Sequence, residues 1–259
     1  METMNSEILS FYLKKPDGEV FSEPLRIHIK TALDIAEKVL DSRLERLANH
    51  ICKDIDFEDL LRISIILHDS GKAFFQQNIR RKNSEEYLSF AGHEFISAII
   101  AEIFTLELSD ELNPSSYFRT AITFSIYYHH HAMNPSYRKR HLIEACRIAK
   151  ENYSRYSEEL EKIIENFLTK NKRHALKRCM ERLNVEKQNI IDNVFVENHL
   201  KRRLDDALIK KYSPELRKLS LLLLDSLIVC DYMAAWNRGE NISSTFSKAV
   251  KMFYDLWFY

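Results

Sequence analysis

The sequence predicts an all-α fold, a bundle of helices. Only 4 of the 259 residues are Gly and 5 are Pro, whereas sheet proteins use both types in their many turns. Apolar residues recur at spacings of three and four through most of the chain, as on the buried face of a helix. Hydrophobic residues make up 45% of the chain, which is enough for a sizeable core.

The first helix is predicted to follow Ser22, a good N-cap before Glu23 and Pro24. Apolar positions then repeat from Leu25 to Leu40, and His28 lies on the same inward face. A second helix is predicted from Asp56 to about Gly71, with the pair His68-Asp69 near its end.

A polar connector at Lys82–Glu86 is predicted to lead to a third helix, which begins near Ser89 and carries His93. Pro114 and Ser115 are predicted to start a fourth helix, which ends on His129–His131. The two helices therefore place further histidines close to helix ends.

The second half of the chain is predicted to be helical and highly charged from Tyr137 to about Leu204. Ser213 then caps a strong apolar helix that carries Asp231 on the stripe of Leu216, Leu219, Leu223 and Leu227. An aromatic tail at 241–259 is expected to pack on the body or to dock on a partner. Without a linker or repeat, we expect one domain over residues 1–259, with its core at about 22–236.

The composition bounds the class of protein. Lys+Arg and Asp+Glu both number 38, so the zero net charge excludes a global electrostatic grip on nucleic acid but allows local basic patches. Cys52, Cys146, Cys179 and Cys230 are dispersed, as in a reduced cytoplasmic protein. No stretch reaches the about 20 apolar residues that span a bilayer, and the start lacks the pattern of a signal peptide. We expect a cytoplasmic protein without a membrane partner.

Histidine and acidic residues form the candidate site. Six of the ten histidines lie in or beside apolar stretches near predicted helix ends. In chain order the candidates are His28, His68, Asp69, Lys72, His93, His129, His130, His131 and Asp231. Imidazole and carboxylate groups together bind divalent transition metals. Two metals about 3.5–4 Å apart stabilise the entering and leaving oxygens of a phosphoryl group. Asp69 is the natural bridge between them, because a carboxylate has two oxygens, and Lys72 is placed to neutralise phosphate oxygens.

Each candidate has a simpler interpretation when it is taken alone. A single His on an apolar helix face, such as His28, is more often a hydrogen-bonded core residue. An HD dipeptide occurs by chance, a triple His can be a solvated turn, and Asp231 can be a buried capping carboxylate. Burying the whole set without partners or metal would cost on the order of several kcal/mol. The joint pattern therefore favours a functional cluster.

The order of these motifs resembles the HD-domain nuclease of type I CRISPR systems, which is paired with a DNA helicase. The matching motifs are HDSGK (His68–Lys72), GHE (Gly92–Glu94), the His pair after an apolar helix, and the late Asp in CDYMAA (Cys230–Ala235). The resemblance spans residues 28 to 235. It implies an HD-type helical bundle of the HD phosphohydrolase superfamily, with the metal site at its centre.

The resemblance also implies the roles of the residues. One metal would be held by His28, His68, Asp69 and Asp231, and the second by Asp69, His93, His129 and His130. The ions would be two divalent metals, with Mn, Ni, Co, Fe or Mg as candidates. Asp69 and Lys72 would be catalytic, with Lys72 near the scissile phosphate. The family commonly has a small residue after the His pair, so His131 leaves His130/His131 open as an alternative pair.

The activity implied is metal-dependent cleavage of single-stranded DNA, sometimes also of RNA, on a strand exposed by an RNA-guided surveillance complex. The chain has no GxxxxGK[ST] phosphate loop, because the GKA at Gly71–Ala73 lacks the first glycine and the hydroxyl. The CRISPR-associated helicase is therefore expected to be a separate partner. One alternative is an HD phosphohydrolase acting on nucleotides or cyclic nucleotides, which needs an enclosed pocket. Another is a non-catalytic interaction subunit, which would lack ligands, whereas none is missing here.

Two further patterns each have both a functional and a structural interpretation. Basic runs between Tyr137 and Arg203 are a candidate strand-binding surface, or a solvated face balanced by acids at Glu158–Asn166. Aromatic residues near the motifs can stack on unpaired bases, but such residues more often belong to the core or its rim. They are Tyr127, Tyr128, Tyr137, Phe74 and Phe75.

Overall fold

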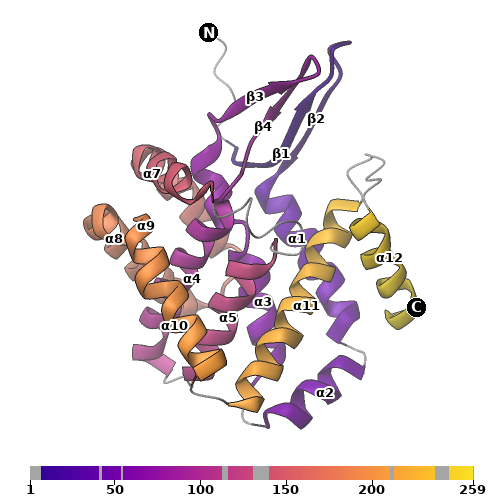
Figure 1. Ribbon diagram of the computed structural model, residues 1–259, viewed down its shortest axis with the longest axis vertical. Helices are drawn as coiled ribbons and strands as arrows, with labels where there is room; N and C mark the ends of the chain where they lie inside the picture. The colour runs from indigo at the N-terminus through magenta and orange to yellow at the C-terminus, as the bar shows by residue number, and fades with distance from the viewer. Residues whose placement is uncertain are drawn as a thin grey trace.

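Long helices make up most of the fold, as the sequence predicts (Figure 1). The computed structural model describes residues 7–40, 43–53, 55–112, 116–130, 140–210, 213–236 and 245–258. The main helices are α1 (Leu25–Leu40), α2 (Arg43–Ile51), α3 (Phe57–Leu67), α4 (His93–Leu112), α5 (Ser116–Tyr128), α7 (Leu142–Glu165), α8 (Lys170–Ile190), α11 (Pro214–Trp236) and α12 (Thr245–Phe258).

Shorter helical segments complete this framework. The 3₁₀ helix η1 (Ser70–Phe75) follows α3 closely. A further helical stretch contains π-helical turns and consists of α9 (Asn193–Phe195), η3 (Val196–Lys201), α10 (Arg202–Asp205) and η4 (Asp206–Lys210). The predicted helical character from residue 140 to Leu204 is therefore confirmed for the part of the chain that the structure describes.

Two predicted helix starts are confirmed by their caps. The Asp56 carboxylate accepts a hydrogen bond from the Asp59 N–H at 3.0 Å at the start of α3. The Ser213 hydroxyl accepts one from the Leu216 N–H at 3.1 Å at the start of α11. Both side chains satisfy an N–H group that has no partner within its helix. The end of α3 is at Leu67 rather than about Gly71, because the chain tightens there into η1.

The structure also contains a small sheet that the sequence pattern did not indicate. Its strands are β1 (Leu9–Lys14), β2 (Val20–Pro24), β3 (Ile79–Lys82) and β4 (Glu85–Leu88), in the order β2-β1-β4-β3. The predicted N-cap at Ser22 is wrong because this residue lies in β2, paired with Tyr12. The helix begins at Leu25, whose N–H donates to the carbonyl of Ile8 at 2.8 Å.

The predicted polar connector at Lys82–Glu86 is a hairpin turn. Asn83 and Ser84 have φ angles of 52° and 65°, as a two-residue hairpin loop requires at both central positions. The predicted helix start near Ser89 is also wrong, since α4 begins at His93. Gly92, with a φ angle of 90°, makes the turn into this helix.

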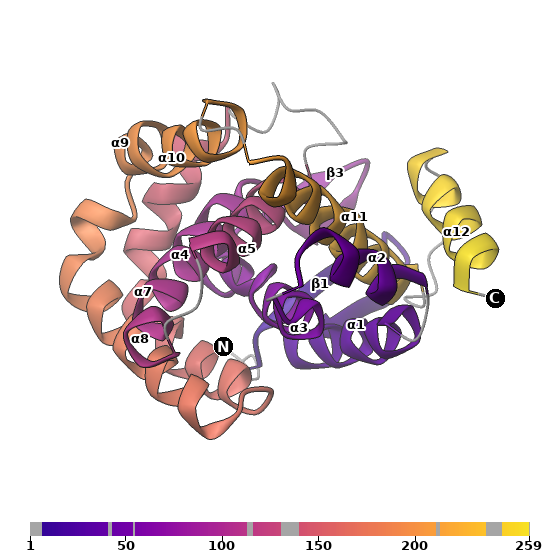
Figure 2. The ribbon, with the colours of Figure 1, turned by 90° about the horizontal axis from the view of Figure 1, so that it is seen from below.

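The helix α11 is the core helix of the fold. It packs against α1, α3 and α5 (Figure 2), and Leu219, Leu223 and Leu227 are buried. By length and composition alone α11 could cross a membrane, but half of its most apolar window is buried within the protein. The position of α11 in the core therefore explains why this helix is so apolar.

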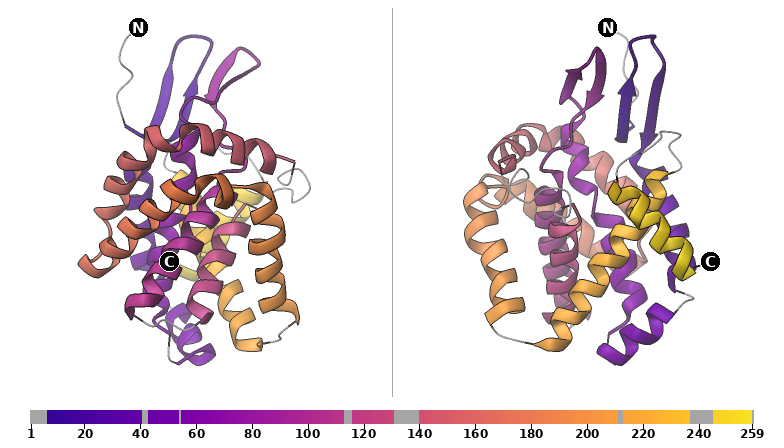
Figure 3. Two further views of the ribbon diagram at one scale, coloured as in Figure 1. Left: turned by 90° about the vertical axis from the view of Figure 1, so that its left-hand side faces the viewer. Right: turned by 45° about the vertical axis from the view of Figure 1, so that its right-hand side comes forward.

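Two further groups of helices pack on this core. The helices α7 and α8 pack against α4, and α7 also packs against η1 (Figure 3). The aromatic tail forms α12, which packs against α11, with the rings of Phe246 and Tyr232 5.1 Å apart. The expectation of one domain over 1–259 stays a prediction.

Gly71 allows η1 to lie directly against the start of α4. Its N–H donates to the Ser97 hydroxyl at 2.9 Å. A Cβ atom at this position would overlap the carbonyl oxygen of His93 and lie 3.0 Å from the Ser97 hydroxyl oxygen. The glycine of the HDSGK motif therefore fixes the position of Asp69 relative to His93.

We predict that Gly71→Ala lowers the free energy of unfolding by about 1–3 kcal/mol, because the backbone of α4 must move to admit the methyl group. Chemical denaturation measures this loss. Gly18→Ala is the control, since Gly18 has a φ angle of 92° but open space around its Cα, so it should lose only about 1 kcal/mol from backbone strain. A Gly71→Ala protein as stable as the unmodified chain would contradict this packing.

Candidate metal centre

The candidate residues meet at the end of the helical body that carries the sheet (Figure 1). His28 lies in the first turn of α1, and His93 is the first residue of α4. His68 and Asp69 follow α3 directly, and His129 and His130 follow α5 in the same way. Asp231 comes from the last third of α11. The fold thus brings together residues separated by up to 203 positions.

These residues form two groups. Within each group, the potential ligand atoms lie within 4.8 Å of one another. One group consists of His28, His68, Asp69 and Asp231, and the other of Asp69, His93, His129 and His130. Asp69 belongs to both. The groups have the composition that the resemblance implied, and the assignment of each residue as a ligand stays a prediction.

The two carboxylate oxygens of Asp69 face different groups. Its Oδ1 lies 2.9 Å from Nε2 of His93. Its Oδ2 lies 3.3 Å from Nε2 of His28 and 3.4 Å from Nε2 of His68. One side chain therefore offers an oxygen to each side of the centre, as a bridging carboxylate must.

Asp231 supplies the second carboxylate on one side only. Its Oδ1 lies 3.1 Å from Nε2 of His28 and 3.5 Å from Nε2 of His68. No histidine of the other group has an ion-pair contact with Asp231 among the described residues. The two groups therefore differ in charge, since Asp231 belongs to one of them alone.

Backbone carbonyl groups fix the orientation of three histidines. The Nδ1 atoms of His68, His93 and His129 lie 2.7, 2.7 and 2.6 Å from the carbonyl oxygens of residues three positions earlier, which are Ile65, Phe90 and Ile126. Ile65 and Ile126 lie in the last turns of α3 and α5, where carbonyl groups have no partner within the helix and can accept these bonds. Phe90 lies in the loop before α4. Each ring then turns Nε2 inward, as in metal sites where the other ring nitrogen binds a carbonyl or carboxylate.

Glu23 orients the fourth histidine and was missed in the sequence. Its Oε2 lies 3.3 Å from Nδ1 of His28 and accepts a hydrogen bond from the Ser10 hydroxyl at 2.7 Å. The acid lies five positions before His28, but nothing in the local pattern distinguishes it from a helix-start residue. Only the pairing of β1 with β2 directs it toward His28.

The unsatisfied atoms of the centre fit a pair of cations. Within the described part of the chain, Nε2 of His68, His93 and His129 and both oxygens of Asp69 are buried and make no hydrogen bond of good geometry, although His93 and Lys72 lie within ion-pair distance of Asp69. Burying such atoms unpaired is costly, and divalent cations would satisfy all of them at once. Mixed imidazole and carboxylate donors suit transition metals.

The protonation states of the centre also suit cations. Burial raises the pKa of Asp69, but the charges of His68 and Lys72 outweigh it and hold this pKa well below its ordinary value. Burial, together with the charges of His68 and His93, lowers the pKa of His129 to about 3. At neutral pH Asp69 is ionised and His129 is neutral, which are the forms that bind metals.

Lys72 reaches the centre from η1. Its Nζ lies 2.7 Å from Oδ2 of Asp69 and 5.4 Å from the centre of the Phe90 ring. The side chain is almost entirely buried, so its charge is poorly screened. The structure thus places Lys72 beside the bridging carboxylate, and its predicted contact with a phosphate stays a prediction.

Some of the remaining sequence-based candidates lie in the core, and others lie outside the described residues. Tyr127, Phe74 and Phe75 are buried, which confirms the interpretation as core residues. Tyr128 is half-buried, and its ring lies 4.7 Å from that of Phe124. His131 and Tyr137 lie outside the described residues, so the alternative pair His130/His131 stays open.

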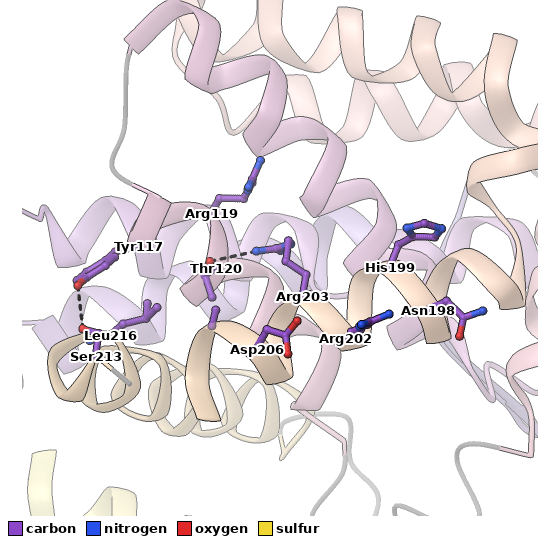
Figure 4. Close-up of a pocket in the computed structure, with 11 residues that line it drawn as sticks. Tyr117, Arg119, Thr120, Asn198, His199, Arg202, Arg203, Asp206, Ser213 and Leu216 are labelled. Carbon is purple, nitrogen blue, oxygen red and sulfur yellow. Dashed lines mark hydrogen bonds between the residues drawn. The ribbon is translucent and has the colours of Figure 1, made fainter. Parts of the chain in front are cut away.

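The predicted basic surface is partly neutralised by internal ion pairs. Arg178 binds Glu107 at 3.2 Å, and Lys172 binds Asp59. A cavity of about 900 Å³ between α5, the 193–210 stretch and α11 is lined by Arg119, Arg202 and Arg203 (Figure 4).

Arg203, one of the arginines of this cavity, makes hydrogen bonds to two neighbouring helices. Its guanidinium group donates to Glu102 at 2.5 Å. It also donates to Thr120 at 3.1 Å (Figure 4). Glu102 is buried and also accepts from the Thr123 hydroxyl. These bonds join α10 to α4 and α5, so Arg203 has a structural role.

We predict that the protein binds about two equivalents of Mn²⁺, that Asp231→Asn binds about one, and that Asp69→Asn binds none with comparable affinity. The reason is that Asp231 belongs to one group and Asp69 to both. Isothermal titration calorimetry and elemental analysis measure the stoichiometry. The exposed His174 on α8 provides the control, since His174→Gln should still bind about two. Equal stoichiometry in Asp231→Asn and Asp69→Asn would contradict the shared carboxylate.

Comparison with known protein families gives one match. A family model described as the HD domain matches residues 42–195, more than half of the chain. Comparison with curated proteins gave no match, and comparison with solved structures gave none. The matched range contains His68, Asp69, His93, His129 and His130, while His28 and Asp231 lie on either side of it. The match indicates a metal-dependent phosphohydrolase, and the chain belongs to the HD domain family.

Proposed function

We propose that this HD domain protein is a nuclease that hydrolyses phosphodiester bonds of single-stranded DNA, with RNA as an alternative substrate, using two divalent metal ions. The observation that carries the proposal is the position of Asp69, whose two oxygens face two separate groups of ligand atoms. A minimal site for one metal would not need His93, His129 and His130. Two adjacent cations suit phosphodiester hydrolysis, where an entering and a leaving oxygen both carry charge.

The residues of the chain would hold the ions in two sets that share Asp69. When bound, the ions (Mn, Ni, Co, Fe or Mg) supply Lewis acidity, which activates water and offsets the negative charge of the phosphate. Asp69 and Asp231 compensate the positive charge of the ions. The carbonyl groups behind His68, His93 and His129 hold the three rings in place before substrate arrives.

Lys72 would bind a non-bridging oxygen of the scissile phosphate. In the structure its ammonium group rests on Asp69 at 2.7 Å. With cations bound beside it, the Asp69 carboxylate would hold Lys72 less strongly, and the ammonium group would be available to a phosphate oxygen. A fixed positive charge in a buried site stabilises developing negative charge more strongly than it would in water.

The biological setting we propose is type I CRISPR interference in the cytoplasm. It is supported by the order of motifs from His28 to Asp231. In this proposal the nuclease acts with a separate CRISPR-associated helicase and an RNA-guided surveillance complex. Hydrolysis of nucleotides or cyclic nucleotides is the competing activity within the same superfamily.

We predict that the purified protein with Mn²⁺ cleaves labelled single-stranded DNA faster than duplex DNA, and that it leaves a panel of nucleotides and cyclic nucleotides intact. Asp69→Ala should lower the rate by at least about a hundredfold, because both metal sites lose a ligand. Gel analysis of the polymer and chromatography of the nucleotides measure the products. Cleavage of nucleotides without cleavage of polymer would overturn the nuclease and favour the competing activity.

We predict that Lys72→Gln lowers kcat for single-stranded DNA by about 10²–10³-fold while the metal stoichiometry stays unchanged, since one charge that stabilises the transition state is lost. The exposed Lys30 on α1 gives a matched control, and Lys30→Gln should be fully active. Steady-state kinetics and metal titration on the same preparations test the two parts. If Lys72→Gln keeps the kcat of the unmodified protein, Lys72 has only a structural role.

A further inference from the structure

One face of the four-stranded sheet carries a row of large side chains. Residues directly opposite each other on paired strands lie on the same face. Phe21 on β2 is opposite Leu13 on β1, Leu13 is opposite Tyr87 on β4, and Tyr87 is opposite Arg80 on β3. The row Phe21-Leu13-Tyr87-Arg80, here called the aromatic face, therefore crosses all four strands.

The side chains of the aromatic face are accessible. Phe21, Leu13 and Tyr87 are half-buried, and Arg80 is exposed. The two hairpins rise beyond the helical body (right view of Figure 3), so no helix packs over their outer parts in these views. Two aromatic rings that are partly open to solvent, on strands that rise beyond the helical body, offer flat surfaces on which a partner can stack.

Cationic groups lie at both ends of this face. Arg80 is exposed at one end of the row. At the other end Nζ of Lys15 lies 4.4 Å from the centre of the Phe21 ring and binds Glu19 at 2.8 Å. The row on the opposite face, Val20-Lys14-Glu86-Arg81, also carries cations but has no aromatic ring, and its Glu86 binds Arg81 at 2.9 Å. Aromatic rings between cations suit a chain of bases joined by phosphates.

The aromatic face leads into the metal centre. Glu23 lies two residues after Phe21 on β2, about 7 Å along the strand and on the same face. Its carboxylate contacts Nδ1 of His28 at 3.3 Å. On the other side of the row, the chain continues from Tyr87 to Phe90, whose ring lies 6.5 Å from the ring of His93. Both ends of the sheet base thus reach residues of the centre.

We propose that the aromatic face binds a single-stranded nucleic acid, with unpaired bases stacked on Phe21 and Tyr87 and a phosphate bound by Arg80, and delivers it to the metal centre. This inference rests on the proposed nuclease function and adds the surface that holds the substrate. Adjacent strands are about 4.8 Å apart, so the two rings are separated by about 10 Å across Leu13. Stacking on rings tolerates any base, which fits a nuclease without sequence preference.

The test measures binding without cleavage. A fluorescent oligothymidylate of about twelve nucleotides, within the range of known single-strand sites, is titrated in EDTA and followed by anisotropy. Phe21→Leu and Tyr87→Leu keep apolar bulk in the sheet but remove the ring, and each should weaken binding by at least about fivefold. Arg80→Gln should weaken binding and reduce the salt dependence by about one phosphate contact.

The controls lie on the opposite face of the same strands. Val20→Ala and Arg81→Gln should bind the oligonucleotide as the unmodified protein does. If the unmodified protein fails to bind, or if Phe21→Leu and Tyr87→Leu bind as tightly as it does, the proposal is overturned and a protein partner becomes the better occupant of this face.

A second measurement separates this proposal from the proposed nuclease function. Hydrolysis of bis(p-nitrophenyl) phosphate with Mn²⁺ needs the metal centre but no stacking surface, so every sheet variant should retain it. Loss of this activity in the sheet variants would mean that they disturb the centre, and the aromatic face would then not be a separate surface. Absence of the activity in the unmodified protein would count against the proposed function, while the anisotropy result would still decide the binding surface.

Discussion

The buried carboxylate of Asp69 is the constraint on which the rest of this structure depends. It lies among the imidazoles of His28, His68 and His93 and the ammonium group of Lys72, with contacts between 2.7 and 3.4 Å. A buried charge is tolerated only when partners surround it. Its partners His28, His93 and Lys72 lie in the first turns of α1, α4 and η1. These three helices must therefore begin close to one another around Asp69.

The histidines exploit a general property of helix ends. The last carbonyl groups of α3 and α5 have no partner within their helices, and His68 and His129 bind them through Nδ1. One contact thus completes the helix and aims Nε2 at the centre. The cost is a set of inward nitrogen atoms without hydrogen-bond partners. Such an arrangement is stable when cations complete it, which links the fold of this HD domain to its metal-dependent chemistry.

The sheet extends this centre outward. The strand β2 carries Glu23 to His28, while the glycine turn at Gly92 brings the β4 side of the sheet to His93. Two hairpins that add little to the helical core therefore position two sides of the metal centre.

The sequence by itself determined the helical class and the capped starts of α3 and α11, because caps and apolar spacing are local patterns. The candidate groups around Asp69 followed from a resemblance in the order of His and Asp motifs along the chain. Family membership follows from a match over residues 42–195, yet His28 and Asp231 lie outside that range. The contact between them, across 203 positions at 3.1 Å, was decided by the packing of α1 on α11. The sheet, the role of Glu23 and the close approach at Gly71 were likewise decided by tertiary structure, because strand pairing between β1 and β4 and backbone contacts between η1 and α4 join segments whose local sequences contain no sign of each other.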